Sequence, residues 1–187
     1  MDGRPPFSGA VLTGGASRRM GQDKALLPVG GRALVTVAAA ALREAGAVEV
    51  LAVGGDAAAL ADLGLRTVAD RFPGQGPLGG ILTALAAATE DVVVVLACDL
   101  PHASADGVGA VLAALGEHAA AVPVVAGRWE ALHAAWRRRA LPALAMAWEK
   151  GERAPWRAVQ RLDVQPVALA DASWVADADT VEDLPPS

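Results

Sequence analysis

Seven apolar residues follow one another without a polar interruption from Val92 to Cys98, as VVVVLAC. A strand with one face in water alternates apolar and polar residues, so an unbroken run is typical of a strand covered on both faces. Such strands occur in parallel sheets that carry helices on either side. The run therefore predicts the centre of an α/β sheet, and Asp99 follows it directly.

Strand and helix patterns alternate along most of the chain, and Gly or Pro marks many of their boundaries. The patterns predict strands at residues 10–12, 48–53, 65–69 and 119–125, and helices at residues 32–45, 57–63, 77–88 and 104–115. This order predicts a doubly wound sheet. The second half is less regular, with strands expected at 132–136 and 164–169 and helices at 139–150 and 181–184. No repeat or linker interrupts the chain, so one domain is expected over residues 1–187.

Composition excludes several classes of protein. The net charge of −5 argues against a general nucleic-acid binder. The apolar stretch Ala33–Leu42 is too short to span a bilayer, and Met1–Gly9 lacks the apolar core of a secretory signal. A lone cysteine, Cys98, rules out an internal disulfide and a multi-cysteine metal site. We therefore expect a cytoplasmic protein.

Polar or glycine residues follow four of the expected strands. Thr13 and Gly14 follow the first, Gly54 the second, Asp70 the third and Asp99 the fourth. In open α/β sheets, ligands bind outside the carboxyl ends of the strands. The sequence therefore predicts one binding edge that gathers these residues.

The loop after the first strand combines bare backbone with cations. Gly14 and Gly15 are followed by Arg18, Arg19 and Lys24. Glycine lets backbone N–H groups approach an anion, and the three cations can neutralise phosphate oxygens. The loop matches neither the P-loop nor the Gly-x-Gly-x-x-Gly pattern. We interpret it as a phosphate-binding loop, with a glycine-rich turn that carries solvated charges as the alternative.

Carboxylates suggest a metal site at the same edge. Asp99 ends an apolar run, where an unpaired carboxylate is unfavourable, and a Mg²⁺ ion that bridges phosphate oxygens would pair with it. Asp177 and Asp179 are two residues apart, so in extended backbone both point the same way. For Asp99, the alternative is a helix cap or a turn-forming aspartate before Pro101. For Asp177 and Asp179, it is an acidic surface turn that caps the last helix.

Two further segments have open interpretations. The segment from Asp70 to Gly80, DRFPGQGPLGG, can border a base or ribose, or can be an ordinary connection. The second half holds seven of the fourteen arginines and all five tryptophans, which suit either a pocket for a flat anionic substrate or helix faces and core. The tryptophans are Trp129, Trp136, Trp148, Trp156 and Trp174.

Four motifs together resemble those of the MobA-like nucleotidyltransferases, and in particular the guanylyltransferase branch that acts on the molybdenum cofactor. The motifs read LTGGASRRMGQDKALLPVGGRAL, VAD…PGQGPLGGILTAL, VVVVLACDLP and DADTVEDL. The resemblance runs from about Ala10 to Leu184. It implies a Rossmann-like three-layer α/β/α sandwich with a mostly parallel central sheet, as in nucleotide-diphospho-sugar transferases.

The resemblance also implies roles for individual residues. It implies nucleotide contacts from Leu12, Thr13, Gly14, Gly15, Arg19, Lys24, Asp70 and Asp99. Arg19, Lys24 and Asp99 would be the catalytic residues. Asp99 and Asp179 would hold Mg²⁺, for which Mn²⁺ is an alternative. The segment EALHAAWRRRALPAL resembles the family's substrate-side strand and the helix that follows it. This resemblance implies that Trp136 and Arg137 belong to the acceptor pocket.

This chain departs from the family at four positions. Thr13 replaces the usual alanine, and Val53 stands where the guanylyltransferases often have asparagine. The tail carries Asp177 and Asp179 where asparagine is common. These departures affect which nucleotide base the site would select more than they affect the transfer reaction.

The resemblance implies transfer of NMP from an NTP, best GTP, to a phosphorylated acceptor, best molybdopterin, with release of pyrophosphate. A cytidylyltransferase for the same cofactor and a sugar-phosphate nucleotidyltransferase are alternatives of the same class. A non-catalytic nucleotide-binding module that aids cofactor insertion is the alternative of another class. We expect a monomer or weak homo-oligomer, with transient contacts to molybdenum cofactor proteins and none to nucleic acid or membrane.

Overall fold

A mixed, mostly parallel sheet runs through the centre of the computed structural model, which describes residues 5–14 and 24–178. The strands lie in the order β10-β7-β9-β6-β1-β4-β5, and the short β8 pairs with β7. β1 lies between β4 and β6 and is parallel to both, whereas β9 is antiparallel to β6 and β7. The strands are β1 (Phe7–Leu12), β4 (Glu49–Val53), β5 (Arg66–Val68), β6 (Val92–Ala97), β7 (Ala120–Val125), β8 (Arg128–Trp129), β9 (His133–Arg137) and β10 (Val164–Val167).

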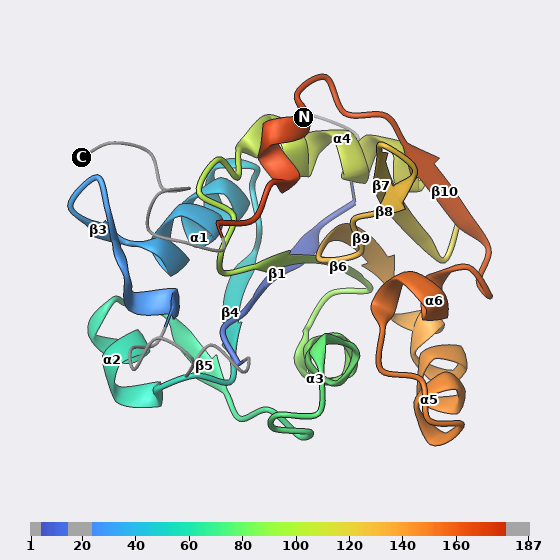
Figure 1. The fold of residues 1–187 in the computed structure, drawn as a ribbon, viewed down its shortest axis with the longest axis horizontal. Coiled ribbons are helices and arrows are strands. Elements are labelled where there is room, and N and C mark those ends of the chain that lie inside the picture. Colours follow the sequence, from blue (N-terminus) through green and yellow to red (C-terminus); the bar gives the residue numbers. More distant parts are fainter. Residues whose placement is uncertain (1–4, 15–23, 179–187) are drawn as a thin grey trace.

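Helices cover both faces of this sheet, which confirms the predicted three-layer fold (Figure 1). α1 (Leu34–Glu44) and α4 (Ala105–Leu115) bury their apolar residues against one face. α3 (Pro77–Ala87), α5 (Leu141–Glu149) and α6 (Pro155–Val159) do so against the other. The short α2 (Ala57–Asp62) connects β4 and β5, and Asp56 caps it through the amides of Ala58 and Ala59.

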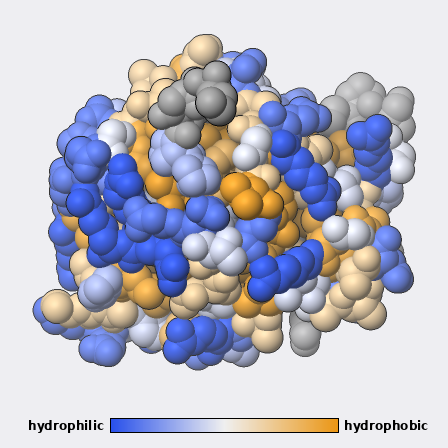
Figure 2. Space-filling model, turned by 180° about the vertical axis from the view of Figure 1, so that it is seen from behind, coloured by the Kyte–Doolittle hydropathy of each residue, from blue (hydrophilic) through white to orange (hydrophobic). Residues whose placement is uncertain are grey.

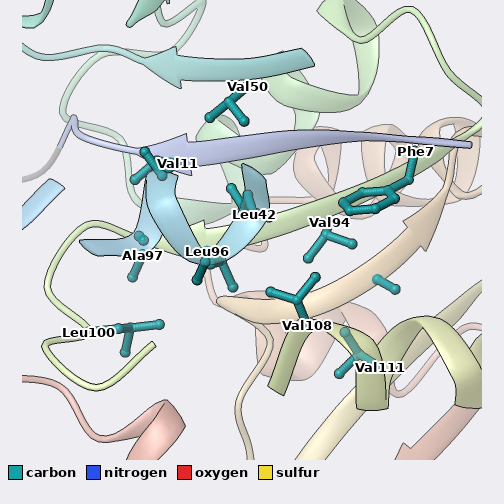
Figure 3. Packing of buried hydrophobic residues seen from close by; sticks show 14 of the residues in the cluster. Phe7, Val11, Leu42, Val50, Val94, Leu96, Ala97, Leu100, Val108 and Val111 are labelled. Carbon is teal, nitrogen blue, oxygen red and sulfur yellow. The ribbon is translucent and has the colours of Figure 1, made fainter. Parts of the chain in front are cut away.

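The unbroken apolar run forms β6, in the middle of the molecule. Its residues alternate between the two cores: Val92, Val94 and Leu96 belong to the α1–α4 side, and Val93 and Val95 to the α3–α5 side. Figure 3 shows Val94 and Leu96 among residues of the first core. Burying a valine side chain contributes roughly 1.5–3 kcal/mol. Both faces of β6 therefore gain from apolar residues, which explains the missing alternation.

Among the described residues, the predicted elements are present within a few residues of their expected bounds, and the structure adds short elements that the sequence did not predict, such as β2 (Pro28–Val29), β3 (Arg32–Ala33) and β8. The helix expected at 32–45 begins only at Leu34, because residues 32–33 form β3, which pairs with β2. Gly30 and Gly31 form the turn between them at φ of 54° and 77°, the left-handed backbone that tight hairpins need. α6 was not predicted.

The remaining elements are short 3₁₀ turns: η2 (Lys24–Leu26), η3 (Arg138–Ala140) and η4 (Ala172–Val175). η3 replaces the start of the helix expected at 139–150. The helix expected at 181–184 lies outside the described residues. Among the helices that the structure describes, none has the length and apolar character needed to cross a bilayer.

Most large apolar side chains are inside the molecule. Seen from behind, strongly hydrophilic residues gather on the left of the view, and apolar residues show between hydrophilic ones elsewhere (Figure 2). The large apolar residues exposed in the described part of the chain are Val48, Leu63, Met146 and Trp156, which lie on different elements or loops. Isolated apolar residues of this kind are normal on a protein surface.

Candidate functional site

The residues that follow β1, β4, β5 and β6 meet at one edge of the sheet, as the sequence predicted. The amides of Thr13 and Gly14 both donate to the carbonyl of Val53, at 3.0 and 3.1 Å. The next turn is attached in the same way, since the Gly54 amide donates to the carbonyl of Val68 at 2.9 Å. Parallel neighbours thus bring the loops of β1, β4 and β5 together at their carboxyl ends.

Two glycine turns touch each other at this edge. A Cβ atom added to Gly54 would lie 2.9 Å from the Cα of Gly14, and the φ of Gly54 is +80°. Both facts require glycine at position 54. Asp70 borders the same contact, because that added Cβ would also lie 3.6 Å from the Cβ of Asp70. At this contact the glycines carry no side chains and the two backbones pack closely. The backbone is therefore accessible to an anion or a nucleoside at this edge.

Thr13 joins the two turns through its side chain. It is 5% exposed, and its hydroxyl lies 3.0 Å from the carbonyl oxygen of Val53 and 2.9 Å from that of Gly54. The Val53 side chain is 1% exposed and points into the core. Leu12 is also buried and packs against Gly80 of α3. Leu12 and Val53 therefore present backbone, not side chains, to this edge.

Asp70 has one carboxylate oxygen bound by the protein. Its Oδ1 accepts from the amide of Phe72 at 3.0 Å and lies 3.1 Å from the hydroxyl of Thr83. Its Oδ2 lies 3.6 Å from the position of a Cβ added to Gly14. Within the described part of the chain, no residue donates a hydrogen bond to Oδ2. This oxygen remains able to accept from a ligand beside the glycine turns.

Lys24 and Asp99 form an ion pair at the end of β6. The Nζ atom of Lys24 lies 2.9 Å from Oδ2 of Asp99, and their side chains are 14% and 24% exposed. Lys24 comes from η2, so the pair joins the glycine-loop segment to the central strand. The backbone carbonyl of Asp99 accepts from the amide of Ala178 at 2.9 Å, which brings the C-terminal segment to the same edge.

The donor set fits a cation held partly by phosphate. Mg²⁺ is usually bound by one or two carboxylates together with substrate phosphates, and not by an all-protein cage. Asp99 supplies such a carboxylate, and the described residues contain no group of three or more His, Cys, Asp or Glu that could hold a metal. The other predicted phosphate and metal residues, Gly15, Arg19 and Asp179, lie outside the described residues.

Glu130 is a further acidic residue near this edge, in the loop before β9. Burial raises the pKa of its carboxyl, the neighbouring Arg128 lowers it, and the charge of Asp177 raises it. The Nε atom of Arg128 lies 3.7 Å from Oε1 of Glu130. No motif of the sequence singles out Glu130, because a single glutamate in a loop carries no spacing signal.

The expectation that Trp136 and Arg137 line an acceptor pocket is wrong. Trp136 is fully buried in the core of the α3–α5 face. β9 is antiparallel, so its end, Arg137, pairs with Val92 at the start of β6, on the sheet edge opposite Asp99. There Arg137 donates to the carbonyl of Gly116 at 2.5 Å and to Asp91 at 3.2 Å. Its role in the structure is to fasten loops at that far edge.

Another part of the tryptophan-rich second half does contact the loop that carries Asp70. The guanidinium carbon of Arg153 lies 3.7 Å from the ring centroid of Trp148, and the rings of Trp148 and Phe72 are 4.5 Å apart. Arg153 also donates to the carbonyl of Trp148 at 2.9 Å, near the end of α5. Because Phe72 follows Asp70 by two residues, this stack fixes the loop that carries Asp70 against α5.

Residues 9–167 match a family model described as the MobA-like NTP transferase domain. A molybdenum cofactor guanylyltransferase of Pseudomonas putida is 34% identical over 179 residues, which cover 91% of each chain. A probable molybdenum cofactor guanylyltransferase of Pelotomaculum thermopropionicum is 48% identical over 94 residues. That match covers 50% of this chain and 45% of the relative, so it spans about half of each.

Solved structures show the same fold at lower identity. A putative protein of Aquifex aeolicus superposes with a TM-score of 0.82 at 24% identity and 96% coverage of both chains. Molybdopterin-guanine dinucleotide biosynthesis protein A of Archaeoglobus fulgidus gives 0.74 at 24% identity and 94% coverage of both. The 2-C-methyl-D-erythritol 4-phosphate cytidylyltransferase of Thermus thermophilus gives 0.71 at 24% and 93% of both. One fold is thus shared by proteins named for different nucleotides.

Proposed function

The chain belongs to the MobA-like NTP transferase family, and from that premise we propose that it transfers a nucleoside monophosphate from an NTP to a phosphorylated acceptor. The proposed donor is GTP and the proposed acceptor is molybdopterin, after the name of the Pseudomonas putida relative that aligns over nearly the whole chain. The observation that carries the proposal is the Lys24–Asp99 pair beside the glycine turns and Asp70. These groups provide a cation for phosphate, a carboxylate for a metal ion and an acceptor for a nucleoside.

The proposed step is an in-line displacement at the α-phosphorus of the bound NTP. An oxygen of the acceptor phosphate forms a new bond to the α-phosphorus, and the bond to the bridging oxygen of pyrophosphate breaks. The acceptor phosphate is already ionised near neutral pH, so no strong general base is needed. Catalysis then depends on positioning and on neutralising the charge of the leaving pyrophosphate.

Each residue of this edge has a part in that step. Lys24, with Arg19, is proposed to bind the β- and γ-phosphate oxygens and stabilise the leaving group. The backbone of Thr13, Gly14 and Gly15 and the Oδ2 atom of Asp70 are proposed to hold the nucleoside and the first phosphate. The burial of Thr13 and the open acceptor on Asp70 support this division.

Asp99 and Asp179 are proposed to hold a divalent cation, Mg²⁺ or alternatively Mn²⁺. When bound, the ion would supply charge neutralisation and polarisation of the phosphoryl oxygens. The position of Asp99 supports the assignment, because its carboxylate lies at the end of β6 next to Lys24, and the phosphates that Lys24 is proposed to bind would supply the other ligands of the ion.

CTP is the second candidate donor, and Val53 is the observation that favours it. The Val53 side chain is buried and its carbonyl already accepts from Thr13 and Gly14, so this position offers no side chain that reads guanine. A cytidylyltransferase would keep the same groups on the phosphates. The choice of base therefore needs a direct comparison of nucleotides.

Thermal-shift titration with GTP, CTP, ATP and UTP, each with and without Mg²⁺, makes that comparison. A ligand that binds only the folded state raises the melting temperature. We expect GTP with Mg²⁺ to raise it by a few degrees and the other nucleotides to raise it less. A preference for CTP would change the donor and keep the reaction class. A response to no nucleotide would contradict the proposed function.

A further inference from the structure

Buried hydroxyl groups at the binding edge lead to a further inference. The buried polar residues in the described part of the chain are Ser8, Thr13, Thr83 and His133. Thr83 is 1% exposed and lies inside α3. A threonine in a helix commonly bonds the carbonyl four residues back, and the Thr83 hydroxyl does lie 3.0 Å from the carbonyl of Gly79. That contact alone would give it only a local role.

Two more contacts attach Thr83 to the loop after β5. Its hydroxyl lies 3.1 Å from Oδ1 of Asp70 and accepts from the amide of Arg71 at 3.2 Å. The hydroxyl therefore binds both the side chain of Asp70 and the backbone that follows it. Phe72 secures the loop from the other side, because a Cβ added to Gly79 would lie 2.7 Å from the Cβ of Phe72.

These contacts decide which carboxylate oxygen of Asp70 stays available. Oδ1 is occupied by the Phe72 amide and by Thr83. With Oδ1 held in this way, rotation of the carboxylate is restricted and Oδ2 remains beside Gly14. A buried hydrogen bond of this kind is therefore well placed to control the direction in which the second oxygen points.

We propose that Thr83 is a positioning residue for the nucleoside: its buried hydroxyl holds Asp70 so that Oδ2 accepts a hydrogen bond from a hydroxyl or amino group of the bound nucleotide. This inference rests on the proposed function, because it assumes a nucleotide at the glycine turns. Thr83 itself touches no ligand and acts through Asp70.

The test compares Thr83→Val, which keeps the shape and removes the hydroxyl, with Thr83→Ser, which keeps the hydroxyl. The dissociation constant of GTP with Mg²⁺ is measured by calorimetry, with CTP used instead if CTP is the preferred nucleotide. Thr83→Val should weaken binding roughly tenfold, and Thr83→Ser should stay within about twofold of the wild type. If Thr83→Val does not fold, Thr83→Ala takes its place.

Ser8→Ala is the matched control. Ser8 is also buried, and its hydroxyl donates to Oε1 of Glu49 at 2.8 Å, but near the start of β1 at the opposite edge of the sheet. Its loss should lower the melting temperature and leave nucleotide affinity unchanged. A loss of affinity in Ser8→Ala equal to that in Thr83→Val would overturn the inference, because the effect would then be general destabilisation.

A double-mutant cycle with Asp70→Asn separates positioning from a structural role. If Thr83 acts through Asp70, Thr83→Val should weaken nucleotide binding by less than about twofold in the Asp70→Asn background. Equal effects in both backgrounds, or an Asp70→Asn variant that binds like the wild type, would overturn the inference and leave the proposed function standing. A wild-type protein that binds no nucleotide would overturn both.

Discussion

Lys24 is the described cation closest to the proposed chemistry, 2.9 Å from Asp99. Lys24→Met removes the charge and keeps much of the side-chain volume. We expect turnover to fall by at least about a hundredfold, because a charge that stabilises the leaving group is lost, while the circular dichroism spectrum stays unchanged. Turnover is measured as the rate of pyrophosphate release with GTP and the acceptor.

Arg66→Met is a matched control for Lys24→Met. Arg66 also pairs with a carboxylate, that of Glu49 at 2.5 Å, but at the start of β5 and far more exposed. Surface pairs of this kind contribute little, so turnover should stay close to that of the wild type. Near-normal turnover in Lys24→Met would remove Lys24 from the mechanism.

Asp99 is predicted to determine metal affinity. Asp99→Asn keeps the size of the side chain and removes the negative charge that a divalent cation needs. In the presence of the preferred nucleotide, we expect Mn²⁺ to bind this variant at least about tenfold more weakly. Electron paramagnetic resonance of free Mn²⁺ measures the binding without any turnover. Equal Mn²⁺ affinity in the variant and the wild type would exclude Asp99 as a ligand.

At the scale of elements, the contact between two glycine turns is the most constrained feature. A Cβ at Gly54 would lie 2.9 Å from the Cα of Gly14, in backbone with a φ of +80°. Gly64 has a similar φ of +71° with no atom within 4 Å of an added Cβ. Gly64→Ala thus tests backbone strain alone, and Gly54→Ala tests strain and contact together.

We expect Gly54→Ala to lower the melting temperature more than Gly64→Ala does, and to weaken nucleotide binding where Gly64→Ala does not. The reason is that separating the turns displaces both Gly14 and the neighbouring Asp70. Thermal melting of the two variants measures the first effect, and a nucleotide titration measures the second. Equal effects of the two substitutions would mean that the glycine contact has no part in binding.

Elements were predictable where local patterns decide them. β6 follows from its apolar run, and α4 follows from the pattern at 104–115, where Ser104 caps the helix through the amide of Gly107 at 3.1 Å. The boundary at Leu34 was not predictable, since Arg32 and Ala33 fit a helix as well as they fit the hairpin that Gly30–Gly31 closes. The direction of β9 was not predictable either, because strand direction depends on neighbours and not on composition.

The antiparallel direction of β9 explains why the prediction that Arg137 lines an acceptor pocket was wrong. A parallel β9 would have placed Arg137 at the carboxyl edge, whereas the antiparallel strand places it beside Val92. Positions after parallel strands, such as Asp70 and Asp99, were predictable because topology alone brings them together. The role of Thr83 was not, since a threonine inside an apolar helix carries no sequence signal for its contact with Asp70.

At the scale of the whole molecule, one buried histidine links stability to pH. His133 is 1% exposed, and burial lowers its pKa from 6.5 to about 4, with a small opposing effect from the backbone of Gly107. Neither ring nitrogen reaches hydrogen-bond geometry with a described residue. The folded protein therefore holds a neutral imidazole where the unfolded chain takes up a proton below about pH 6.5.

The folded state should consequently lose stability as the pH falls from about 6.5 toward 4, with no contribution from His133 above about 7. The titration of His133 alone should make the free energy of unfolding of the protein about 2 kcal/mol lower at about pH 5 than at about pH 7.5. Urea unfolding at the two pH values measures it. His133→Phe should reduce the difference. An unchanged pH dependence in His133→Phe would contradict the assignment.

All the residue roles proposed above depend on nucleotidyl transfer by this protein. Incubation of the protein with Mg²⁺, GTP labelled at the α-phosphate and molybdopterin tests it most directly. We predict that the label moves into a dinucleotide product, with one pyrophosphate released for each label transferred. Binding of GTP and CTP without label transfer or pyrophosphate release from either would contradict nucleotidyl transfer and leave a nucleotide-binding module.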